Sequence, residues 1–156
     1  MTDEAFAKAI LALTETMYRV CYAQLRQQAD REDAVQEALK KAWEKRRTLR
    51  DESAIKPWML RILMNECRNI QRKNRWETVN NQEERIAYPQ DADRTMHDLI
   101  LSLPDKLRLP VVLVFMEGMT GAQAAKALAI PQGTVHSRIH KARQILKTKW
   151  EEANRE

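Results

Sequence analysis

The chain has 156 residues, of which 44% are hydrophobic and 31% are charged, and its formal net charge is +5. This apolar fraction can fill a core, which excludes a disordered chain, and the length suits one domain or two small ones. With only three glycines there is no glycine-rich phosphate loop and too little hairpin chemistry for an all-β fold, which leaves a helical, basic protein.

The N-terminal half predicts three amphipathic helices. Apolar residues recur every three or four positions over about 3–28, which predicts a first helix with one buried stripe. A second helix is expected over about 30–49, with Asp30 as its N-cap and Trp43 on its apolar face. After a short loop, a third helix begins with Pro57 in its first turn and ends in a basic cluster. Three such helices can close a small core.

Export and membrane insertion are not expected. The longest apolar run, 109–116, is far shorter than the roughly 20 residues that a spanning helix needs. The chain begins with acidic residues where a signal peptide carries basic ones. Cys21 and Cys67 form no CxxC pair and are expected to be buried thiols in a reducing compartment. The sequence therefore predicts a cytoplasmic protein.

A change of composition separates two helical modules. Apolar periodicity is lost over 76–94, where two basic and five acidic side chains give a net charge of −3, which predicts a flexible acidic linker. A short helix is expected to follow from about Thr95. The apolar run 111–116 then predicts a buried helix, kinked near Pro110 and stopped at Gly118.

The last third of the chain predicts a helix-turn-helix. Thr120 can cap a first helix, residues 129–131 interrupt it, and a second helix begins at Gln132. Ala129 occupies the turn position where glycine is more usual. From 134 to 149 the second helix has five basic residues and no acidic one, which suits the major groove and the phosphates of DNA.

Three motifs follow one another along the chain. They are Asp33-Ala34-Val35-Gln36-Glu37-Ala38 with Ala42-Trp43, Pro57-Trp58-Met59-Leu60-Arg61-Ile62 with Asn65, and Ile130-Pro131 with Gly133-Thr134-Val135, Ser137-Arg138 and Ala142-Arg143. In that order they resemble the core-polymerase-binding helix, the promoter-melting helix and the −35-binding domain of bacterial extracytoplasmic-function (ECF) sigma factors. The resemblance implies an all-α fold of two small helical domains joined by a flexible acidic linker. Region 2 would span 1–75, the linker 76–94 and region 4, with its helix-turn-helix, 95–156.

The resemblance also assigns functions to single residues. Asp33, Gln36 and Glu37 would dock on the β′ clamp helices of core polymerase. The loop at 50–54 would capture a base flipped from the −10 strand, since an unstacked base needs hydrogen-bonding side chains around it. The candidate −10 residues are Arg50, Asp51, Ser53, Lys56, Arg61, Asn65, Arg68 and Arg72. The candidate −35 residues are Thr134, His136, Ser137, Arg138, His140, Lys141 and Arg143.

The implied function is promoter recognition for RNA polymerase, without enzymatic activity. The implied partners are core polymerase, through the β′ clamp helices and the β flap, promoter DNA and an anti-sigma protein, by which the family is commonly held inactive. The free protein is expected to be a monomer that needs no cofactor. His136 and His140 are not expected to bind a metal, because no third ligand lies nearby in sequence and Arg138 and Lys141 repel a cation.

Two other interpretations stay open. A stand-alone helix-turn-helix regulator would form a stable homodimer and bind a palindromic duplex. A helical adaptor that binds no DNA would explain Asp33 and Glu37 as solvated helix acids. In either case Trp58 is expected in the core rather than stacked on a base, because it shares helical spacing with Met59 and Ile62. The adaptor leaves the acid-free helix after Thr134 without an explanation.

Overall fold

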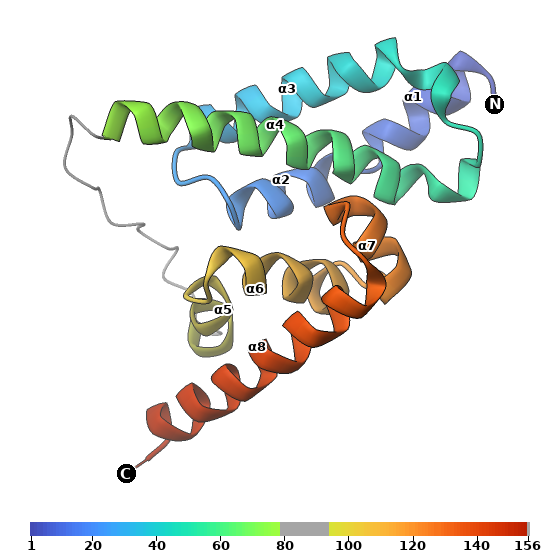
Figure 1. Cartoon of the computed structure of the whole chain (residues 1–156). Coiled ribbons are helices and arrows are strands. Elements are labelled where there is room, and N and C mark those ends of the chain that lie inside the picture. Colours follow the sequence, from blue (N-terminus) through green and yellow to red (C-terminus); the bar gives the residue numbers. More distant parts are fainter. Residues whose placement is uncertain (79–93, 156) are drawn as a thin grey trace. The chain divides into compact units, whose positions relative to one another are not determined.

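The structure is a computed structural model that describes residues 1–78 and 94–155, and every regular element in these ranges is helical. The helices form two compact units, one built from α1 to α4 and the other mainly from α5 to α8 (Figure 1). The expected all-α fold is thereby confirmed. The acidic linker expected at 76–94 lies mostly outside the described residues. None of the described helices combines the length and apolar character needed to cross a membrane.

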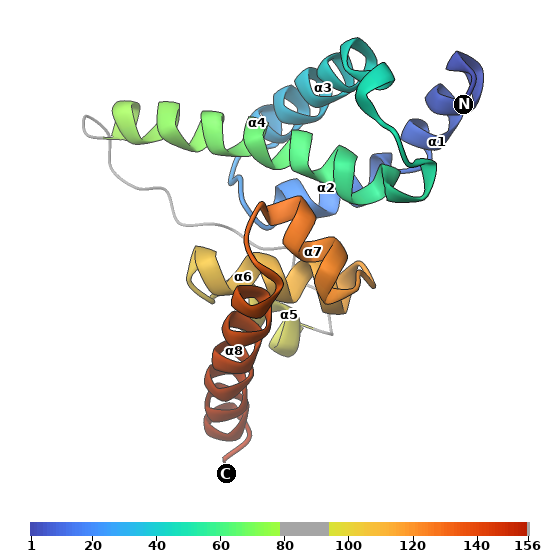
Figure 2. The same ribbon diagram turned by 45° about the vertical axis from the view of Figure 1, so that its right-hand side comes forward.

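The N-terminal unit is built around two long neighbouring helices. Its elements are α1 (Asp3–Leu11), α2 (Thr14–Tyr22), α3 (Gln28–Glu44), the 3-10 turns η1 (Arg46–Thr48) and η2 (Glu52–Ala54), and α4 (Ile55–Thr78). Figures 1 and 2 show α3 and α4 side by side, and α2 packs against both. The largest fully buried side chains of this unit are Met17, Met59, Leu60, Leu63, Val20 and Val35.

The single helix predicted over 3–28 is wrong, because the chain forms two helices there. The chain leaves the helix after Leu11, and the amide of Leu13 donates to the carbonyl of Ile10 at 3.0 Å. Buried apolar residues keep their helical spacing on both sides of the break, with Ile10 before it and Met17 after it. Periodicity alone therefore does not reveal the break.

The N-cap predicted for the second helix is also wrong. The helix starts at Gln28, with Gln27 as its N-cap, and Asp30 lies inside the first turn. A carboxylate in the first turn interacts favourably with the helix dipole. The Asp30 carboxylate also accepts a hydrogen bond from Asn74 Nδ2 of α4 at 3.1 Å. The residue therefore ties two helices together instead of capping one.

Two buried groups of α4, Glu66 and Cys67, contact neighbouring helices of the unit. Lys41 Nζ of α3 lies 2.5 Å from Oε1 of Glu66, which is 7% exposed. The hydrogen bond to Glu66 raises the pKa of Lys41. The Sγ atoms of Cys21 and Cys67 lie 3.6 Å apart, both buried and both free, as expected from the sequence. The contact with Cys21 and the burial raise the pKa of the Cys67 thiol.

The C-terminal unit packs around its last helix. Its elements are α5 (Arg94–Leu101), α6 (Asp105–Val111), the π turn η3 (Val112–Met116), α7 (Gly121–Leu128) and α8 (Gln132–Ala153). Helix α8 packs against α5 and α6. A core of Leu103, Leu107, Val111 and Ala142 lies between them, with Ile100, Ile145 and Leu146 packed against it.

The buried helix predicted over 111–116 is only partly correct. Val112 and Leu113 are buried, but Phe115 and Met116 are 52% and 39% exposed. The chain widens there into a π turn, in which the amide of Glu117 donates to the carbonyl of Val112 at 3.0 Å. The extra residue changes the phase of the helix within the turn, where Phe115 and Met116 face away from the core, whereas Glu117 just after the turn is buried.

Candidate nucleic-acid interface

Helices α7 and α8 form the predicted helix-turn-helix. The amide of Gln123 donates to Thr120 Oγ1 at 3.1 Å, and the amide of Thr120 donates to Gln123 Oε1 at 3.0 Å. This reciprocal pair caps α7 at its start. In the turn, Ala129 has a φ of +56°, in the left-handed region where glycine is usual. The predicted cap and the predicted turn position are both confirmed.

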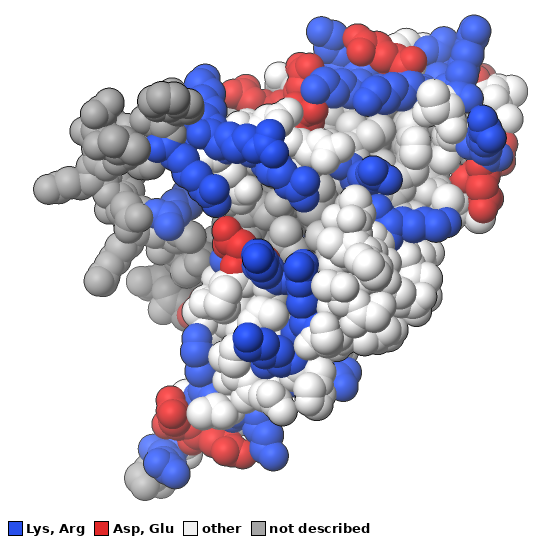
Figure 3. Space-filling model, viewed as in Figure 1, with Lys and Arg blue, Asp and Glu red and all other residues white. Residues whose placement is uncertain are grey.

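The buried side of α8 determines which side chains face outward. Val135 and Ala142 are fully buried and Ile139 is 8% exposed, so the predicted inward face is confirmed. Thr134 and Arg138 are half-buried beside this face. The other candidate −35 side chains are exposed, namely His136, Ser137, His140, Lys141 and Arg143. Figure 3 shows Lys and Arg side chains along α8, with acidic ones gathered near its C-terminal end.

Several of the exposed side chains of α8 are held by neighbours on the same helix. Gln132 Nε2 lies 3.4 Å from His136 Nε2, and Gln144 Nε2 lies 3.3 Å from His140 Nε2. Ser137 Oγ donates to the Thr134 carbonyl at 3.1 Å. These pairs, three and four residues apart, restrict the side chains before any ligand is bound.

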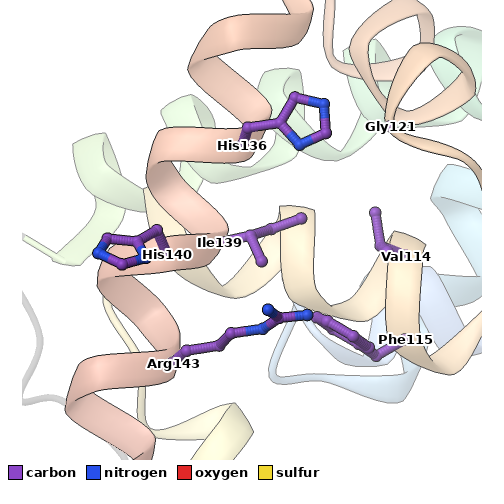
Figure 4. A pocket seen from close by; sticks show the side chains of 7 residues that line it. All are labelled: Val114, Phe115, Gly121, His136, Ile139, His140 and Arg143. Carbon is purple, nitrogen blue, oxygen red and sulfur yellow. The ribbon is translucent and has the colours of Figure 1, made fainter.

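A hollow of about 370 Å³ opens between η3, the start of α7 and α8 (Figure 4). In this view His136 points toward Gly121, Ile139 toward Val114, and Arg143 across to Phe115. The lining residues are Val114, Phe115, Gly121, His136, Ile139, His140 and Arg143. None of them is acidic, so the hollow suits an anionic ligand rather than a cation. No group of three or more metal-binding side chains occurs anywhere in the described part of the chain.

Two contacts across this hollow escape sequence reasoning. The Arg143 guanidinium carbon lies 5.1 Å from the centroid of the Phe115 ring. A methyl group added to Gly121 would come within 3.1 Å of Cε1 and 3.2 Å of Nε2 of His136. Each contact joins α8 to a segment 15 or more residues earlier, and no local motif signals such a pairing.

The predicted base-capture loop of the N-terminal unit is an ordered turn. The Asp51 carboxylate accepts hydrogen bonds from Ser53 Oγ at 2.7 Å and from the Ser53 amide at 3.0 Å, which caps η2. These hydrogen bonds lower the pKa of Asp51. Arg50, Asp51 and Ser53 are exposed, and Lys56 is half-buried. Two of the predicted −10 residues, Asp51 and Ser53, are therefore hydrogen-bonded to each other on the surface.

The remaining candidate −10 residues form one stripe along α4. Arg61, Asn65, Arg68 and Arg72 follow at three- and four-residue spacing, and all four are exposed. Figure 3 shows basic side chains along this face of α4. Trp58, predicted as a core residue, is half-buried, and its ring meets the Phe6 ring edge-on with 5.8 Å between the centroids.

The candidate polymerase-binding residues share the outer face of α3. Asp33, Gln36 and Glu37 are exposed. Trp43 lies further along α3 and is 44% exposed, so its predicted place on the apolar face is wrong. Its ring contacts the buried Phe6 ring, with 6.3 Å between the centroids, and the Arg46 guanidinium carbon lies 4.0 Å from its centroid, so these two residues cover only part of it.

Comparison with known proteins connects both units to one class. Residues 4–77 match the family model of Sigma-70 region 2, and residues 93–146 match that of Sigma-70, region 4. The ECF RNA polymerase sigma factor SigW of Bacillus subtilis is 28% identical over 165 residues, covering 93% of this chain and 88% of that protein. The ECF RNA polymerase sigma factor SigM of Mycobacterium tuberculosis is 30% identical, covering 83% of this chain and 69% of that protein.

Solved structures share the fold. The sigma factor RpoE of Bartonella quintana, in complex with the anti-sigma factor NepR, gives a TM-score of 0.79 at 22% identity and covers 97% of this chain and 99% of that one. CnrH, in complex with the cytosolic domain of CnrY, gives a TM-score of 0.70 at 22% identity and covers 99% of this chain and 92% of that one.

Proposed function

The chain belongs to the ECF family of RNA polymerase sigma factors, and on that premise we propose that it binds core polymerase and directs initiation at promoters with −10 and −35 elements. The observation that carries the proposal is the helix-turn-helix, whose second helix buries Val135, Ile139 and Ala142 and exposes a basic face without acids from 134 to 149. Basic residues on such a face favour binding to DNA phosphates, and the other exposed side chains between them can contact base edges.

We assign the −35 element to the C-terminal unit, as region 4 over 95–156. The exposed side chains at the start of α8 would reach base edges, since the N-terminal residues of a recognition helix enter the major groove. His136, Ser137, His140 and Lys141 are the candidates for this role. Thr134, Arg138 and Arg143 would hold the phosphate backbone and set the register of the helix.

We assign polymerase binding and the −10 element to the N-terminal unit, as region 2 over 1–75. The acidic face of α3 offers charge complementarity to a basic partner surface, which favours fast and specific association. The stripe Arg61, Asn65, Arg68 and Arg72 would hold the separated strand. Arg50, Asp51, Ser53 and Lys56 would surround a flipped base, and the two hydrogen bonds between Asp51 and Ser53 fix the exposed turn at η2 on which they lie.

An anti-sigma protein is the proposed regulator. RpoE of Bartonella quintana was solved with the anti-sigma factor NepR, and CnrH with the cytosolic domain of CnrY. A partner that covered either unit of this chain would disable initiation, because promoter binding through two linked weak sites depends on both.

The first test is association with core polymerase. The purified full chain is mixed with bacterial core RNA polymerase and analysed by size-exclusion chromatography. We expect co-migration, and loss of co-migration in Asp33→Arg/Glu37→Arg, which reverses the charge of the α3 face. Glu4→Arg/Glu15→Arg is the matched control, because it makes the same charge change at exposed positions of α1 and α2.

Two outcomes contradict the proposal. Failure of the wild-type chain to associate while it migrates as a dimer would favour the stand-alone regulator. Equal loss in the control variant would show that net charge, and not the α3 face, governs binding. Transcription of genomic fragments by the assembled holoenzyme, with the transcript starts mapped, then tests the two promoter elements.

A further inference from the structure

We propose that Phe115 is a positioning residue for DNA binding, and that its ring, exposed by the π turn η3, holds the guanidinium of Arg143 in place on the face of α8. The inference rests on the proposed −35 function of this face. It adds a residue outside the helix-turn-helix to the machinery that would hold DNA.

The π turn is what brings Phe115 to the surface. Val112 and Leu113, at the start of the turn, are buried, whereas Phe115 is 52% exposed. The hydrogen bond from the Glu117 amide to the Val112 carbonyl spans the five residues that define the turn. π turns of this kind occur often at functional sites, and this one places an aromatic ring beside α8.

The contact with Arg143 has the geometry of a cation–π interaction. The guanidinium carbon lies 5.1 Å from the ring centroid, inside the limit of about 6 Å for this interaction. Figure 4 shows the Arg143 side chain extended from α8 across the hollow to the ring. An arginine beside an aromatic face keeps its planar set of N–H donors, which matches the geometry of phosphate.

Preorganisation is the reason this contact would matter for DNA. A free arginine on a helix surface samples many rotamers, and fixing it on a phosphate costs side-chain entropy. With the guanidinium already resting on Phe115, less of that freedom is left to lose on binding. The residues lining the hollow include no carboxylate, so the charge of Arg143 is not neutralised there.

The test uses the full chain and a fluorescein-labelled DNA duplex about 30 base pairs long, of arbitrary mixed sequence, because phosphate contacts do not depend on sequence. Fluorescence anisotropy gives Kd between about 20 and 150 mM salt. Arg143→Ala is expected to weaken binding and to reduce the slope of log Kd against log salt by about 0.9, the value of one phosphate contact. Phe115→Leu is expected to weaken binding about two- to fivefold, the fold-change of an exposed cation–π contact.

Three further variants separate positioning from a structural role. Phe115→Tyr keeps the ring face and should bind as wild type. Phe115→Leu should have no effect in the Arg143→Ala background, because the group that it positions is gone. Met116→Leu, which alters the neighbouring exposed residue of the same turn, is the matched control. Circular dichroism and thermal melting check that each variant is folded.

Each contrary result is distinct. No binding by the wild type at the lowest salt would overturn the proposed DNA function of this face and the inference with it. Unchanged binding by Arg143→Ala would overturn the inference alone, because Thr134 and Arg138 would still hold phosphates. Weaker DNA binding by Arg143→Ala, with unchanged binding by Phe115→Leu, would overturn the inference alone. If Phe115→Leu weakened DNA binding equally in the wild-type and Arg143→Ala backgrounds, the inference would also be overturned, because Phe115 would then act independently of Arg143.

Discussion

Helices α4 and α8 are the longest in the described chain, with 24 and 22 residues, and each carries a basic outer face. Their inner faces differ. Besides its apolar core, α4 is tied to its unit by polar contacts, since Glu66 bonds to Lys41, Gln71 Nε2 donates to the Gln24 carbonyl at 3.1 Å, and Asn74 donates to Asp30. Along α8 the buried residues are all apolar, namely Val135, Ile139 and Ala142, and the small Ala142 packs where α8 meets α6.

This difference shows two ways of holding a surface helix in register. Polar contacts have directions, so a helix bound by several of them tolerates few rotations or shifts along its axis. Apolar contacts have no such direction, so the turn before α8 has a larger part in setting the direction of that helix. We therefore expect the two units to respond differently to the same kind of substitution.

The largest expected effect is loss of volume in the N-terminal core. Leu63 is fully buried, and Leu63→Ala should lower the free energy of unfolding by about 3 kcal/mol through lost contacts and the cavity left behind. Urea unfolding followed by circular dichroism measures the change. Leu11→Ala, at a position 66% exposed, is the control and should change little. Equal losses in both variants would mean that burial does not govern the stability of this unit.

The opposite substitution probes the C-terminal unit. Ala142 is fully buried where α8 meets α6, so Ala142→Leu should crowd the crossing and destabilise the unit by about 2 kcal/mol. Thermal unfolding followed by circular dichroism measures the change. Thr148→Leu adds a similar side chain at an exposed position of the same helix and should leave the transition unchanged. A stable Ala142→Leu variant would show that close approach is not what holds α8.

The ion pair of α4 predicts a dependence on pH. The pKa of Lys41 is higher in the folded chain than in the unfolded one. The ion pair therefore contributes its full stabilisation of the folded state below the unfolded pKa of about 10.4. That stabilisation is lost as the pH rises through the pKa of Lys41 in the folded chain. Glu66→Gln removes the charge and keeps the shape. The stability difference between wild type and variant should therefore be constant near neutral pH and shrink in alkali. A difference that does not change with pH would show that the charge of the pair contributes nothing.

The smallest expected effect concerns the face of α8 itself. Gly121→Ala would bring a methyl group against the His136 ring, and that ring can move at little cost because it ends a flexible side chain. The free energy of unfolding should change by less than about 0.5 kcal/mol, and the NMR signals of the His136 ring should shift. Gly133→Ala is the control, since a methyl group there meets nothing within 4 Å. Unmoved His136 signals in Gly121→Ala would contradict the contact.

Local chemistry made much of this structure predictable. The Thr120 cap, the turn at Ala129 and the inward positions Val135 and Ile139 follow from residue types and spacing within a few positions of each other. Most of the candidate site residues lie on the expected helices or in the 50–54 turn, and most of their side chains are exposed. Their roles toward DNA and polymerase stay predictions.

Features that depend on packing between distant segments were not predictable. The break between α1 and α2 lies within an uninterrupted apolar stripe, so spacing does not mark it. The π turn that exposes Phe115 occurs in a run that is apolar at every position from 111 to 116, where any helical phase would look equally buried. The contact of Phe115 with Arg143 depends on that turn, so the sequence offered no signal for it.

The adjacent thiols of Cys21 and Cys67 allow local unfolding of the N-terminal unit to be measured by thiol labelling. Both sulfur atoms are buried between α2 and α4, and a thiol reagent reaches them only when those helices separate. The rate at which the native chain is labelled, compared with the rate for the unfolded chain, therefore reports how often the helix pair opens. Labelling that slows when core polymerase is added would show that binding on α3 stabilises the contact between α2 and α4, the two helices packed against it.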